Sequence, residues 1–68
     1  MKNNLKELRK KHNMTQADVL AKTKIAMATI SGIETGRRDI KDITLETALR
    51  FAKCFNCIVE DLVKIDEE

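Results

Sequence analysis

Cys54 and Cys57 form a C-x-x-C motif, the spacing found in thiol redox sites and in zinc sites. A structural zinc ion needs four ligands, but the only soft ligands in this chain are the two cysteines and His12. We therefore expect both cysteines to be ordinary core residues, with no metal and no cofactor bound. His12 is interpreted as a packing or capping residue at the end of a helix, where the helix dipole favours it.

Side chains that could perform catalysis do not follow one another in any recognisable motif. A nucleophile, its general base and an orienting group cannot be assembled from the spacing of Ser, Cys, His and acidic residues. We therefore expect that the protein is not an enzyme.

Charged residues are distributed unevenly along the chain. Up to Arg38 there are nine Lys and Arg against three Asp and Glu, whereas from Asp39 onward there are four against eight. A basic half would suit a protein that meets a polyanion with one side, but ordinary solvated helix faces would explain the same counts. Charge alone leaves both interpretations open.

The length of 68 residues predicts a single domain over 1–68, near the lower limit for a stable apolar core, so marginal stability or dimerisation is expected. No apolar run is long enough to cross a bilayer, and the amino terminus M-K-N-N-L-K-E-L is too charged for a signal peptide. These features predict a cytoplasmic protein that does not enter a membrane.

The elements that would position these side chains are predicted to be helices. Pro, Trp and Tyr are absent and only two Gly occur, which favours an all-α fold. The periodicity of apolar residues, with Thr15 and Thr44 as N-caps and Gly36 as a C-terminal stop, predicts five helices. Their expected ranges are 4–12, 16–23, 26–35, 44–55 and 59–65.

The fourth helix is expected to be central because apolar residues extend well round it. Its predicted buried stripe contains Leu45, Ala48, Leu49, Ala52 and Phe55, widened by Phe51 and Cys54. The last helix is short and apolar, so it either covers the first and fourth helices or meets a second copy of the chain.

The third helix has an unusual composition on its outward side. Ile30 and Ile33 are expected to face the core, while Ala28, Ser31, Gly32 and Thr35 are expected to face out. A face with such small side chains either approaches a partner closely or makes few contacts.

The stretch T-Q-A-D-V-L-A-K-T-K-I-A-M-A-T-I-S-G-I-E-T-G-R-R resembles the helix-turn-helix of the phage repressor and Cro family of transcriptional regulators. L-K-E-L-R-K-K resembles the family's first helix, and T-L-E-T-A-L-R-F-A-K-C-F-N-C-I-V-E-D-L-V its fourth and fifth, so the resemblance covers nearly the whole chain. The positions that match the family pattern are Thr15, Gln16, Val19, Ile25, Ile30, Ser31, Ile33, Glu34, Gly36 and Arg38.

The resemblance implies a five-helix domain of the lambda-repressor type that binds double-stranded DNA as a homodimer, with the third helix in the major groove. The base-facing positions would be Met27, Ala28 and Gly32, with Thr29 and Ser31 beside them. Phosphate contacts would come from Gln16, Thr35, Arg37, Arg38 and Lys41. Arg9 and Glu34 would form a structural ion pair between the first and third helices.

Several residues depart from the family pattern. None of the base-facing residues is Arg, Lys, Asn or Gln, so thymine methyl groups and DNA shape are the expected determinants of sequence preference. Met27 could equally pack in the core. Lys24 replaces the turn glycine and Ala26 replaces the serine cap of the third helix, which predicts a strained turn and a helix without a side-chain cap.

The leading hypothesis is a small transcriptional regulator that binds operator DNA and competes with, or recruits, RNA polymerase. The alternative is a protein-interaction module on the same scaffold, such as an antitoxin that binds a toxin-like protein or a repressor-like adaptor. In that case the bare third helix would pack against a protein helix.

Overall fold

The computed structural model describes residues 2–64, which are mainly helical, as predicted. Four α-helices, two 3-10 turns and two very short strands occur in the described part of the chain. In chain order they are β1 (Lys2–Asn3), α1 (Leu5–Lys11), α2 (Gln16–Thr23), α3 (Met27–Glu34), η1 (Ile40–Asp42), α4 (Leu45–Cys54), η2 (Val59–Leu62) and β2 (Val63–Lys64).

Helices α1 to α4 lie within one residue of their predicted bounds because local capping signals define their ends. The Thr15 hydroxyl accepts a hydrogen bond from the Asp18 amide, and the Asp18 carboxylate accepts one from the Thr15 amide, which forms a capping box at α2. Thr44 caps α4 by accepting from the Thr47 amide. Helix α3 begins after Ala26 without a side-chain cap, as expected.

Left-handed backbone conformations close the helices. Asn13 and Asn56 have φ values of 56° and 53°, and Gly36 has a φ of 83°, residue types that tolerate this region. Lys24 adopts the same conformation, with a φ of 61°, at the turn between α2 and α3. The predicted strained turn at Lys24 is therefore confirmed.

The predicted fifth α-helix is wrong. Its segment forms the single 3-10 turn η2 followed by β2, and Ile65 lies outside the described residues. Strand β2 pairs antiparallel with β1, placing Asn3 opposite Val63, and the Asn4 amide donates to the Leu62 carbonyl at 2.8 Å. In an α-helix the backbone amides and carbonyls of this segment would bond to one another, but here they bond to the backbone of the amino-terminal segment instead.

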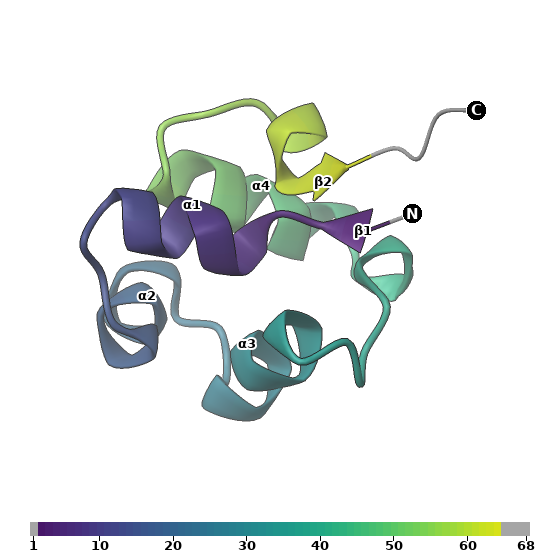
Figure 1. Cartoon of the computed structure of the whole chain (residues 1–68), viewed down its shortest axis with the longest axis horizontal. Coiled ribbons are helices and arrows are strands. Elements are labelled where there is room, and N and C mark those ends of the chain that lie inside the picture. Colours follow the sequence, from purple (N-terminus) through teal and green to yellow (C-terminus); the bar gives the residue numbers. More distant parts are fainter. Residues whose placement is uncertain (1, 65–68) are drawn as a thin grey trace.

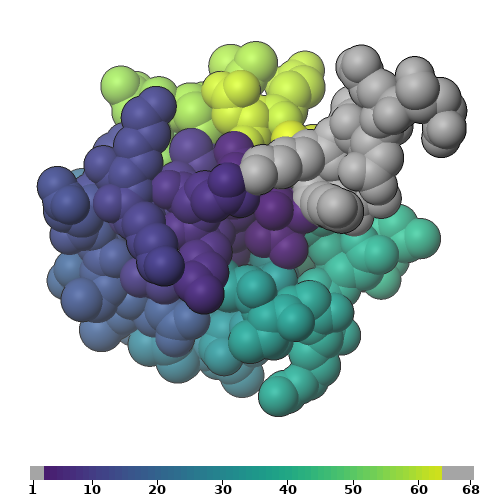
Figure 2. Space-filling view, in the orientation of Figure 1, coloured from purple at the N-terminus to yellow at the C-terminus, as the bar shows by residue number. Residues whose placement is uncertain are grey.

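Helices α2 and α3 lie together on one side of the molecule, while η2 and β2 lie on the opposite side, with α1 and α4 between them (Figure 1). Helix α2 contacts both α3 and α4, and η2 packs on α4. Figure 2 shows the purple amino-terminal segment at the centre of one face, with the blue residues of α2 beside it.

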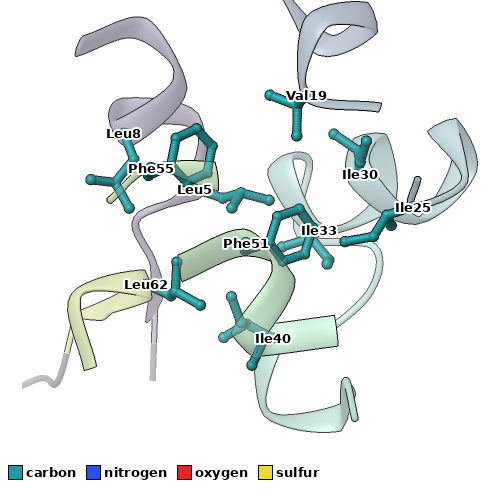
Figure 3. Close-up of a cluster of buried hydrophobic side chains, with 11 residues drawn as sticks. Leu5, Leu8, Val19, Ile25, Ile30, Ile33, Ile40, Phe51, Phe55 and Leu62 are labelled. Carbon is teal, nitrogen blue, oxygen red and sulfur yellow. The ribbon is translucent and has the colours of Figure 1, made fainter. Parts of the chain in front are cut away.

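The core is formed by apolar side chains from every α-helix and from both 3-10 turns (Figure 3). Phe51 of α4 and Phe55, the residue that follows α4, are the largest of them and are almost fully buried. Ile40 of η1 is also buried, so it anchors the loop after α3 in the core. The buried cluster is Leu5, Leu8, Val19, Ile25, Ile30, Ile33, Ile40, Ala48, Phe51, Phe55 and Leu62.

The predicted buried stripe of α4 is partly wrong. Leu45 and Leu49 were expected in the core, but they are 71% and 52% exposed. The buried face is instead formed by Ala48, Phe51, Ala52 and Phe55. Because the two phenylalanines fill the space beneath α4, the helix is rotated so that its two leucines lie on the surface.

Candidate nucleic-acid interface

The buried ion pair between Arg9 and Glu34 connects α1 to the last turn of α3. Arg9 Nε lies 2.8 Å from Glu34 Oε2, and its Nη2 lies 3.1 Å from Oε1, so the contact is bidentate. The Glu34 side chain is only 3% exposed. Hydrogen bonds to Glu34 raise the pKa of Arg9, which remains charged, and its Nη1 donates to the Met14 carbonyl. The pair therefore fixes the position of α3 against α1.

Gln16 extends this network from the first turn of α2. Its side-chain Nε2 donates to Glu34 Oε1 at 3.1 Å. The amide nitrogen carries two hydrogens, so one remains free to donate to another acceptor. Gln16 is therefore held at the amino end of α2 with a hydrogen-bond donor still available.

The outward face of α3 has few polar groups, as the sequence indicated. Met27 is 36% exposed and Ala28 is exposed, whereas Thr29 and Ser31 are half-buried. The alternative that Met27 packs in the core is thus not what the structure shows, because Met27 lies at the surface.

Gly32 does not lie on this outward face. It is buried, and a Cβ added there would lie 3.5 Å from Arg38 Cβ. The Arg38 amide also donates to the Gly32 carbonyl at 2.9 Å. The expectation that Gly32 faces outward is wrong because the chain after α3 folds back over it.

The chain that follows α3 presents cations on the surface. Arg37, Arg38 and Lys41 are exposed, and Lys41 is held on η1, where the Asp39 carboxylate accepts from its amide. Thr35 is exposed as well, but its hydroxyl donates back to the Ser31 and Gly32 carbonyls. The residues for which phosphate contacts were expected thus lie in two places, at the start of α2 and after α3.

Sequence reasoning missed a group of residues next to this surface. A hollow of about 280 Å³ lies beside α3, lined among others by Lys24, Thr29, Arg38, Thr44 and Arg50. Arg50 is held by the Thr23 carbonyl at 3.3 Å and by Glu46 Oε2 at 2.9 Å. The i, i+4 spacing of Glu46 and Arg50 was the available signal, but α4 was expected to be a core helix.

Cys54, Cys57 and His12, whose types could suggest a redox or zinc site, pack against the core or cap a helix. Cys54 and Cys57 are free and half-buried, and burial raises the pKa of both thiols, which disfavours the reactive thiolate. The His12 ring lies 5.7 Å from that of Phe55, and its Nδ1 lies 2.9 Å from the Leu8 carbonyl, which confirms a packing and capping role. Within residues 2–64, no three His, Cys, Asp or Glu side chains gather as metal ligands would.

No helix among residues 2–64 has the length and apolar character needed to span a bilayer.

Comparison with known proteins agrees with this geometry. The chain is 37% identical over 68 residues to an HTH-type transcriptional regulator of Methanocaldococcus jannaschii, covering all of this chain and 98% of that protein. Two HTH-type transcriptional regulators of Archaeoglobus fulgidus are 34% and 32% identical over the full chain, which covers 92% and 93% of their lengths. The family model of the Cro/C1-type HTH DNA-binding domain matches residues 4–68. The chain therefore belongs to the Cro/C1-type helix-turn-helix family of DNA-binding transcriptional regulators.

Proposed function

We propose that this protein binds operator DNA as a homodimer, with α3 of each protomer in the major groove, and thereby regulates transcription in the cytoplasm. The observation that carries the proposal is the Arg9, Glu34 and Gln16 network, which fixes α2 and α3 beside exposed cations. A rigid helix pair with cations at its edges is the arrangement with which helix-turn-helix proteins dock on a duplex. The bound protein would compete with, or recruit, RNA polymerase.

Phosphate contacts would provide most of the affinity. The free amide hydrogen of Gln16 and the charges of Arg37, Arg38 and Lys41 are the groups that can reach backbone phosphates, with exposed Thr35 beside them. If each protomer neutralises about three phosphates, log affinity should fall with log salt at a slope of about −5 for the dimer. A flat response to salt would contradict this part of the proposal.

Sequence preference in the groove would depend on small contacts. Met27 and Ala28 are exposed and apolar, so they suit thymine methyl groups, and Thr29 and Ser31 offer hydroxyls. DNA shape would add to the preference without further side-chain contacts.

An exposed apolar pair supports the homodimer. Leu45 and Leu49 are one turn apart on α4, so they lie on the same side of the helix, and both are more than half exposed. A second copy of the chain would cover them and remove this apolar surface from water.

The experiment that tests the function replaces Arg37, Arg38 and Lys41 together with alanine and measures retention of duplex DNA. All three side chains are exposed, so the fold should be preserved, which circular dichroism can check. We expect DNA retention to be lost. Unchanged retention would favour the protein-interaction module, an antitoxin or adaptor whose small outward residues on α3 pack against a partner helix.

A further inference from the structure

Helix α3 lacks the side chains that usually read bases, although it lies at the proposed interface. Between Met27 and Glu34 there is no Arg, Lys, Asn or Gln. Bidentate recognition of guanine or adenine therefore requires a group from outside the helix. The chain immediately after α3 contains such a group.

Arg38 is attached to the surface of α3 by its backbone. Its amide donates to the Gly32 carbonyl at 2.9 Å, and its Cβ occupies the position next to the missing side chain of Gly32. The φ of Gly32 is not positive, so its backbone conformation does not require glycine. A methyl group at Gly32 would lie at ordinary contact distance from the Arg38 stem, whereas a larger side chain would enter the space that this stem occupies.

The Arg38 side chain runs back along α3 toward its first turn. Its Nη1 lies 3.4 Å from the Thr29 hydroxyl oxygen, a long hydrogen bond at the surface. Among residues 2–64 no carboxylate lies within ion-pair distance of Arg38, whereas Arg9 and Arg50 each have an acidic partner. A guanidinium group has five N–H donors, so Arg38 retains most of them for a ligand.

We propose that Arg38, laid across Gly32 beside Thr29, is the residue that reads a guanine in each half-site. This inference rests on the proposed function, because it requires α3 to lie in the major groove. The planar guanidinium would donate two hydrogen bonds to guanine O6 and N7, a pairing for which its geometry is well suited. Thr29 would orient the group before DNA binds, and the bare face of α3 would let the backbone approach the bases.

For Arg38 this role replaces the phosphate contact proposed above, and the two roles differ in a measurable way. A phosphate contact changes affinity for all sequences equally and changes the salt slope, whereas a base contact changes the preference at one position. Arg38→Lys keeps the positive charge but removes the planar fork, so it separates the two roles.

The test is selection of bound sequences from random duplexes by the wild type and by Arg38→Lys, with Arg37→Lys as the matched control. We expect guanine at one fixed position of each half-site for the wild type and for Arg37→Lys. We expect Arg38→Lys to lose at least about fivefold of that preference, since one bidentate pair contributes roughly 1 to 3 kcal/mol and 1 kcal/mol corresponds to a factor of about five. Its affinity for unrelated sequences and its salt slope should stay the same.

A second pair of variants tests the same contact without changing Arg38. Gly32→Leu would occupy the space of the Arg38 stem and should remove the preference at the same position. Gly32→Ala adds only a Cβ at ordinary contact distance and should retain it. Thermal unfolding of each variant shows whether its fold is preserved.

The outcomes separate the two claims. If the wild type retains no duplex in dilute buffer, the proposed function fails and the reading role fails with it. If the wild type selects a sequence but Arg38→Lys keeps the full preference, or loses affinity for all sequences alike, Arg38 does not read a base while the DNA-binding function stands.

Discussion

Among single residues, Glu34 has the most demanding surroundings, because its carboxylate is almost fully buried and depends on Arg9 for its charge balance. Removing one partner of a buried ion pair leaves the other charge without compensation. We expect Glu34→Ala to lower the free energy of unfolding by about 3 kcal/mol, measured by urea denaturation.

The exposed pair of Glu46 and Arg50 is the matched control for this variant. The two side chains are 75% and 45% exposed and lie one turn apart on α4. Glu46→Ala should change the free energy of unfolding by at most about 0.5 kcal/mol. Equal effects of the two substitutions would show that the buried Glu34 pair contributes no more to the free energy of unfolding than the exposed Glu46 pair.

Asp18 should make the stability depend on pH. Hydrogen bonds from Thr15 lower the pKa of Asp18 in the folded state. A carboxyl group with a depressed folded pKa contributes stability above its unfolded pKa of about 3.9, and this contribution disappears as the pH falls through the folded pKa. We therefore expect wild type to be more stable than Asp18→Ala at pH 6, with the difference in urea midpoint shrinking below about pH 4. A difference that stays constant down to pH 2 would contradict the capping role.

At the scale of elements, the two glycines that flank the end of α3 should respond oppositely to alanine. Gly32 lies within the helix and has room for a Cβ, so Gly32→Ala should raise the free energy of unfolding by about 0.5 to 1 kcal/mol. Gly36 has a φ of 83°, which an alanine adopts only with strain, so Gly36→Ala should lower it by about 1 kcal/mol. Calorimetric melting of both variants checks the signs, and a loss of stability in Gly32→Ala would show that Arg38 is packed more tightly than described.

Capping and turn residues predicted the ends of helices correctly, because these residues act on the few positions next to them in the chain. Thr15 and Thr44 cap the helices that follow them, and Gly36 ends α3 in the left-handed conformation. The segment after Ile58 was predicted wrongly because its partner, β1, lies at the other end of the chain. A pairing between such distant segments leaves no periodic signature in either of them.

At the scale of the whole molecule, the exposed leucines of α4 predict how two copies meet. We expect the double variant Leu45→Glu, Leu49→Glu to be monomeric in sedimentation equilibrium, because charges would replace the apolar contact. Its circular dichroism should match that of the wild type, since both side chains are exposed. A wild type that stays monomeric both alone and on DNA would contradict the homodimer.

The functional surface was only partly predictable from the sequence. The motif indicated Gln16, Arg9 and Glu34, and the structure brings these three side chains together in one network. The motif did not indicate that Arg38 lies over Gly32 and reaches Thr29. The direction of this loop side chain depends on how Ile40 anchors the loop in the core, which the motif does not contain.

The sequence by itself determined the helical character of the chain, the ends of four helices and the helix-turn-helix family, because caps, turn residues and periodicity act over a few neighbouring residues. Only the tertiary structure decided which face of α4 is buried, that the last segment pairs with the first, and where the Arg38 side chain lies. These features depend on how two phenylalanines and the buried isoleucines fill one small core, and packing of that kind is a property of the assembled elements rather than of any one segment.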